Sequence, residues 1–276
     1  MNSASDVAGY RLQADAVVEK RRKSRFVVAG VYAVMLGLVI WSIDVTIIKD
    51  TDWERMGSLA KVWESTSRFI GFDFELLTEL LVPTIETLLI ACFGTFLGLV
   101  LCIPAAWFGA MNITPYKPVT YPLARLMMTL SRSIHEIVWA LFFVSVVGLG
   151  AMAGVLAIAV RSVGFIAKMT AEAIEDIDYG PVEAIRAVGG SPFQVIVYAI
   201  LPQVLPQIVS VVIFEWEINI RRSAVLGLVG AGGLGLVFFR QMNTFNYYGV
   251  TTVIFAILLI IILGEAVSYF IRRRLI

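Results

Sequence analysis

Long stretches without a charged residue recur along the chain, at residues 26–43, 87–116, 137–160, 187–214, 223–239 and 241–264. A helix that crosses a bilayer needs about 20 apolar residues. Once proline, glycine and polar positions are trimmed from these runs, the pattern predicts an all-α integral membrane protein with six transmembrane helices. We expect these helices near residues 26–43, 83–104, 133–148, 151–169, 200–221 and 247–270.

Basic residues at both ends of the chain predict the orientation of these helices. Five lysines and arginines lie within residues 20–25, before the first span, and Arg272, Arg273 and Arg274 follow the last. Such residues remain on the cytoplasmic side, so we expect both termini in the cytoplasm. The predicted organisation is a cytoplasmic arm (1–25), a first transmembrane helix (26–43), an extracytoplasmic segment (44–80) and a transmembrane domain (81–276) with a cytoplasmic loop at 170–202.

Composition narrows the function classes. Hydrophobic residues make up 59% of the chain and charged residues 16%, which is typical of a membrane protein. A net charge of +1 argues against a nucleic-acid-binding protein, and a single histidine, His135, against a His-rich metal site. No nucleophile–base set and no G-x-x-x-x-G-K-[ST] motif occurs in the sequence. We therefore expect neither an enzyme nor a cofactor or metal site.

The loop between the fourth and fifth predicted spans contains one short isolated helix. Gly180 permits a turn before it, Pro181 fits its first helical position, and Gly189 and Gly190 end it. Ser191 then has the character of an N-cap for the next helix. A helix of about eight residues is unstable alone in water, so it either docks into a partner or lies on the lipid surface as an amphipathic connector.

A motif in this loop resembles the E-A-A loop of ABC importer permeases. Glu183-Ala184-Ile185 is followed after three residues by Gly189, and after nine more by Ala199-Ile200-Leu201-Pro202. Two positions depart from the family pattern, because Ile185 replaces a small residue and Ala199 replaces an isoleucine. The resemblance implies a coupling helix that docks on a separate ATPase subunit. The implied coupling residues are Pro181, Glu183, Ala184, Ala187, Gly189, Gly190 and Ser191.

Further segments look like the permease subunit of phosphonate importers. They are residues 132–136 (RSIHE), 147–150 (VGLG), 180–183 (GPVE) and 229–233 (VGAGG), within a resemblance that covers about 80–276. It implies a five-helix type I importer core after one extra N-terminal helix, in a bacterial inner membrane. It also implies as partners a second permease subunit, expected to make a homodimer, a cytoplasmic ABC ATPase dimer and an extracytoplasmic phosphonate-binding protein.

Ionisable residues inside the predicted spans are candidates for the translocation pathway. Glu217, Asn219 and Arg221 alternate near the end of the fifth span, and this E-x-N-x-R pattern also resembles phosphonate permeases. Glu217 and Arg221 are four residues apart and can pair. Arg221, together with Arg222, either presents positive charge to an anion in transit, with Glu217 holding Arg221 in place, or forms a purely structural ion pair with Glu217.

A second candidate pair lies at the start of the third span. Arg132 and Glu136 are also four residues apart. They are expected to form either a buried salt bridge or a gate contact. Arg221, Arg222 and Arg240 lie on the predicted outer half of the membrane, where basic residues need compensation.

Glycines are concentrated in residues 223–239, at positions 227, 230, 232, 233 and 235. This density argues against a plain spanning helix. The run either permits close helix packing or forms a re-entrant or broken helix that lines a cavity. The spacing of Gly94 and Gly98 fits a helix-dimerisation motif.

Other functions remain open from the sequence. The cargo of such a permease could be phosphite, another small oxyanion or an amino acid. A secondary transporter would need membrane-embedded ion sites and inverted repeats, and neither is evident. A membrane scaffold without transport activity is a further alternative.

Overall fold

The computed structural model describes residues 25–50 and 57–275 as helices joined by short loops, in two units, Met1–Thr66 and Ser67–Ile276. The first unit contains the apolar helix Arg25–Lys49, long enough to cross a membrane, whose last turns form the π-helix η1 (Asp44–Lys49). Helix α3 (Leu59–Ser67) follows. This helix covers the first predicted span, 26–43, whereas the basic residues before Arg25 lie outside the described residues.

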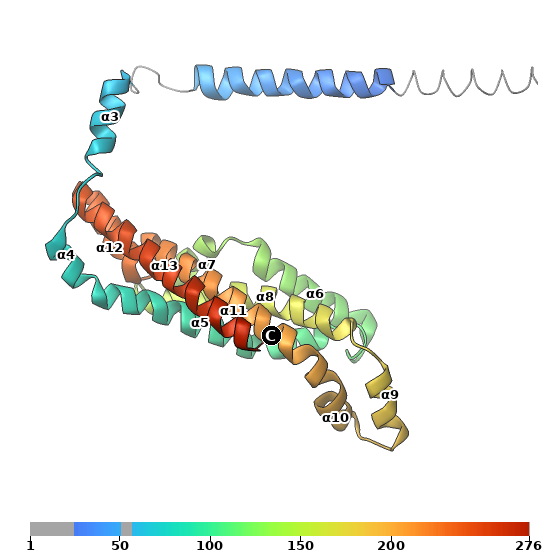
Figure 1. Cartoon of the computed structure of the whole chain (residues 1–276). Coiled ribbons are helices and arrows are strands. Elements are labelled where there is room, and N and C mark those ends of the chain that lie inside the picture. The colour runs from blue at the N-terminus through green and yellow to red at the C-terminus, as the bar shows by residue number, and fades with distance from the viewer. Residues whose placement is uncertain (1–24, 51–56, 276) are drawn as a thin grey trace, which may run out of the picture. The chain divides into compact units, whose positions relative to one another are not determined.

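The second unit is a helical bundle (Figure 1). Its elements are α4 (Phe74–Glu79), α5 (Leu81–Gly109), α6 (Lys117–Ser133), α7 (Glu136–Val147), α8 (Ala151–Glu175), α9 (Gly180–Ala187), α10 (Pro192–Val195), η2 (Ile196–Ile200), α11 (Leu201–Leu226), η3 (Gly227–Val229), α12 (Gly233–Asn243) and α13 (Tyr247–Leu275). Among the described residues five helices can span a membrane, or six if the bent pair α6–α7 counts as one span. The six-helix architecture is therefore confirmed in outline.

The third span differs from its prediction. We expected one helix at 133–148, but α6 begins at Lys117 and meets α7 at an angle of 90°. The break falls at Ile134 and His135, which both have extended backbone angles. The His135 ring caps α7, because its Nδ1 accepts a hydrogen bond from the Ile137 amide at 3.3 Å. A helix therefore begins in the middle of this crossing.

Small residues bring α5 and α8 together. A Cβ atom on Gly94 would lie 2.6 Å from Ile158 Cγ2, and one on Gly98 would lie 2.7 Å from Ser162 Cβ. The Gly94–Gly98 pair thus packs two helices of the same chain, where the sequence pattern had suggested dimerisation. Without side chains at these positions, the helix axes can approach closely.

The glycine-rich run interrupts the helix and also allows α12 to pack closely against the end of α11. Helix α11 ends at Leu226, and a turn with left-handed Gly230 (φ 87°) leads into α12. A Cβ on Gly235 would collide with the carbonyl oxygen of Ala224. The run therefore does not form one spanning helix, and glycine is required where α12 packs against the end of α11.

Candidate coupling helix and membrane-embedded polar site

Helix α9 has the boundaries that the sequence predicted. Asp178 Oδ1 accepts a hydrogen bond from the Gly180 amide at 2.9 Å, which fixes the turn before it. At its other end Gly189 has φ +80°, and the Gly190 amide donates to the Ile185 carbonyl at 2.9 Å. This left-handed C-terminal stop favours glycine over residues with a Cβ atom.

The helix after α9 is capped as expected. Ser191 Oγ accepts from the Gln194 amide at 3.4 Å, and Gln194 Oε1 accepts from the Ser191 amide at 2.7 Å. This reciprocal pair is a capping box. The π-helix η2 follows directly before Pro202, which lacks an amide hydrogen. Gln203 Nε2 donates to the Ala199 carbonyl at 2.8 Å.

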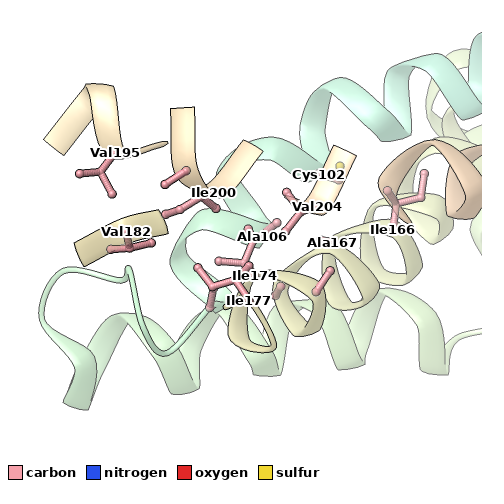
Figure 2. Close-up of a cluster of buried hydrophobic side chains, with 14 of the residues drawn as sticks. Cys102, Ala106, Ile166, Ala167, Ile174, Ile177, Val182, Val195, Ile200 and Val204 are labelled. Atoms are coloured by element: carbon pink, nitrogen blue, oxygen red, sulfur yellow. The ribbon is translucent and has the colours of Figure 1, made fainter. Parts of the chain in front are cut away.

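One side of α9 anchors it to the bundle. Val182 is 2% exposed and belongs to an apolar cluster with Ile177, Val195 and Ile200 (Figure 2). The predicted coupling residues are otherwise exposed, except for half-buried Gly190. In Figure 1, α9 and α10 lie at the end of the bundle opposite α4 and α12. A short helix thus presents an uncovered surface while its other side packs against η2 and α10.

An ion-pair cluster supports the bundle near α9. Arg125 of α6 contacts Glu175 at 2.9 Å and Glu172 at 3.5 Å, and its Nε donates to the Gly109 carbonyl at 2.9 Å. These bonds join the middle of α6 to the C-terminal ends of α5 and α8.

Asn219 is the centre of a polar site inside the bundle. It is fully buried, and its Nδ2 donates to Thr95 Oγ1 of α5 and Ser162 Oγ of α8, both at 2.9 Å. Its Oδ1 accepts from Arg222 Nη1, also at 2.9 Å. The side chain therefore connects three helices, and each of these polar partners replaces a bond to water.

Glu215 compensates the buried charge of Arg222. It is 1% exposed, and its Oε1 lies 2.7 Å from Arg222 Nη1 and accepts from Ser162 Oγ at 3.1 Å. Sequence analysis missed Glu215, although it is two helical turns from Arg222 and thus on the same face. A charge inside a membrane needs a partner of opposite charge. The Glu215 carboxylate is that partner for Arg222.

The predicted Arg132–Glu136 pair is wrong. The break between α6 and α7 separates the two side chains, and Arg132 is exposed. Glu136 instead lies 3.2 Å from Arg161 Nε and 3.6 Å from Arg222 Nε. Sequence analysis also missed Arg161, although an arginine within the predicted span 151–169 was the signal that could have found it.

Glu217 and Arg221 form the predicted pair, at 2.8 Å. The pair lies on a different face of α11 from Asn219 and Arg222. Glu217 also contacts Arg272 at 2.6 Å, and Arg221 contacts Glu265 at 3.0 Å, so the network joins α11 to α13. Asn219 does not belong to it, because two residues along a helix turn by about 200°. The E-x-N-x-R pattern therefore contributes to two separate networks.

Comparison with known proteins decides the family. Residues 98–276 match the family described as "Binding-protein-dependent transport system inner membrane component". The chain belongs to this family. It is therefore a multi-pass inner-membrane component of a transport system.

Two relatives are named as permeases for phosphorus oxyanions, and others as D-methionine permeases. The chain is 39% identical over 202 residues to the phosphite transport system permease PtxC of Stutzerimonas stutzeri, covering 73% of each chain. It is 36% identical over 211 residues to the phosphate-import permease PhnE of Mycolicibacterium smegmatis, covering 76% of this chain and 40% of the relative.

A solved structure shows the same fold. The inward-facing MetNI methionine ABC transporter superposes with a TM-score of 0.65 at 25% identity, covering 74% of this chain and all of the matched chain. A bacterial alginate ABC transporter matches with a TM-score of 0.54 at 19% identity over 88% of this chain and 94% of the other. The fold of this inner-membrane component is that of ABC importer permeases.

Proposed function

We propose that this permease forms half of the translocation pathway of an ATP-driven importer for phosphonates. The observation that carries the proposal is α9, a rigid helix with an uncovered face at one end of a membrane bundle. Because the chain has no phosphate-binding loop of its own, ATP hydrolysis is assigned to a partner that docks on this face.

The chemistry of the relatives supports the cargo class. The names of the two relatives described above specify phosphite and phosphate transport, and that of a third, the cryptic permease PhnE2 of Escherichia coli, specifies phosphonate transport. These anions share a small phosphorus centre that carries oxygens able to accept several charge-assisted hydrogen bonds. Phosphite is the second candidate cargo, favoured by the 39% identity to PtxC.

The assembly we infer has two copies of this chain, a cytoplasmic ATPase dimer and an extracytoplasmic binding protein. Residues 1–25 and the C-terminal arginines are assigned to the cytoplasm, together with α9, and residues 44–80 to the outside. Because Arg272 contacts Glu217, this assignment also moves Glu217 and Arg221 away from the outer half of the membrane, where Arg221 was expected. When ATP closes the ATPase dimer, the two α9 helices move toward each other. The anchored face of α9 then carries α8 and α11 along, and the two permease halves rock to expose the pathway alternately.

Affinity purification and reconstitution test the proposal. The tagged chain is purified in mild detergent from cells that express the transport system, and the co-purifying subunits are identified. Liposomes that contain the assembly and the binding protein should accumulate labelled methylphosphonate only with ATP, and methionine should not be accumulated. Uptake driven by an ion gradient without ATP, or the absence of an ATPase partner, would overturn the proposal.

A further inference from the structure

Two arginines converge on one carboxylate where the third crossing is broken. Arg161 Nε lies 3.2 Å from Glu136 Oε2, and Arg222 Nε lies 3.6 Å from Glu136 Oε1. The exposed fractions of these side chains are 24%, 14% and 12% for Arg161, Arg222 and Glu136. The Nε atoms of both guanidinium groups therefore lie near the same carboxylate in a largely buried place.

The two arginines are held by other groups. Arg222 Nη1 donates to Glu215 at 2.7 Å and to Asn219 at 2.9 Å. Arg161 Nη1 donates to the Arg132 carbonyl at 3.1 Å. Since none of these bonds involves Glu136, the arginines keep their places when its carboxylate leaves.

Among Glu136, Arg161 and Arg222, Glu136 is the residue that another anion can displace. Its Oε2 and the facing Arg161 Nε are buried atoms without a hydrogen-bond partner among the described residues. The contact to Arg222 is longer than a hydrogen bond. Glu136 is thus held by charge alone, whereas Glu215 is hydrogen-bonded to both Arg222 and Ser162.

We propose that a phosphorus oxyanion in transit replaces the Glu136 carboxylate between Arg161 and Arg222, and that Glu136 closes the site when it is empty. This inference rests on the proposed function. A guanidinium edge binds two oxygens of one anion at once, and a phosphonate or phosphite offers such oxygens as a carboxylate does. Glu136 itself thus marks where the oxygens of the cargo bind.

Charge and helix geometry agree with this role. With Glu136 in place, two arginines face two glutamates and the cluster is neutral. Without Glu136, two positive charges face only Glu215, so one positive charge remains for the cargo. Glu136 is also in the first turn of the 12-residue helix α7, whose positive end favours an anion.

The test measures anion binding to the purified permease–ATPase assembly without its binding protein. Equilibrium dialysis with labelled phosphite should show at least tenfold tighter binding after Glu136→Gln, because the competing carboxylate is gone. Adding Arg161→Gln to this variant should abolish the gain. Glu172→Gln is the matched control, since Glu172 also lies between two cations, Arg125 and Lys168, near α9.

Binding that Glu136→Gln leaves unchanged, or that Glu172→Gln tightens equally, would overturn the inference. If the Glu136 variant does not assemble, Arg161→Lys provides the test, because an ammonium keeps the charge but loses the two-donor edge. It should slow uptake at least tenfold with the melting temperature and ATPase partner retained, and unchanged uptake would refute the role. If liposomes with the wild-type assembly take up no phosphorus oxyanion, the proposed function itself is refuted. If they do take it up, a negative result with the Glu136 or Arg161 variants refutes only the site inferred here.

Discussion

Replacing Gly189 tests whether α9 transmits ATP hydrolysis to transport. The residue has φ +80°, and a Cβ atom added there would meet nothing within 4 Å. A substitution therefore acts through backbone conformation, with no steric collision. The left-handed conformation costs an L-residue about 1–2 kcal/mol, and more when the side chain is β-branched.

This cost has a defined consequence for Gly189→Val. One to two kcal/mol corresponds to an about 5- to 30-fold lower ratio of native to non-native turn. The turn carries the bonds from the Gly189 amide to Arg186 and from the Gly190 amide to Ile185. We expect uptake by reconstituted liposomes to fall by up to about this factor, while basal ATP hydrolysis continues. The measured quantity is ATP hydrolysed per anion transported, which should rise.

Gly189→Asn is the matched control, because asparagine adopts left-handed angles more readily than other residues. Its uptake should remain within about twofold of wild type if backbone conformation decides. Wild-type coupling in Gly189→Val would refute the reasoning. An equal loss in both variants would show that any side chain at this position blocks docking, and that the angle is irrelevant.

Three further substitutions separate local from tertiary effects. Ser191→Ala removes the capping box and about 1 kcal/mol of helix stability, so amide hydrogen exchange should accelerate in α10; unchanged exchange would contradict this. Asn219→Leu leaves buried partners unpaired, at about 1–3 kcal/mol each, and should lower the melting temperature of the purified assembly, whereas an unchanged value would show that its bonds are dispensable. Gly235→Ala forces a collision with Ala224 and should reduce the yield of folded protein, whereas Gly37→Ala, with open space around its Cβ, should not; equal yields would refute the close contact.

The sequence determined the features that depend on neighbouring residues. The lengths of the apolar runs predicted the spans, because a bilayer requires a fixed length of apolar helix. Gly180, Gly189 and Ser191 predicted both ends of α9 and the cap that follows, because turn and cap preferences are local. The pair Glu217–Arg221 was predictable for the same reason, since one helix turn brings its members together.

Only the tertiary structure decided which polar groups meet inside the bundle. Arg161 reaches Glu136 from another helix, and Asn219 bonds to Thr95, which is 124 residues away. Such contacts depend on how helices are rotated against one another, and no local spacing encodes that rotation. The break after Ile134 shows the same limit: Arg132 and Glu136 had the right spacing for a pair, but spacing predicts contact only where the helix between them is continuous.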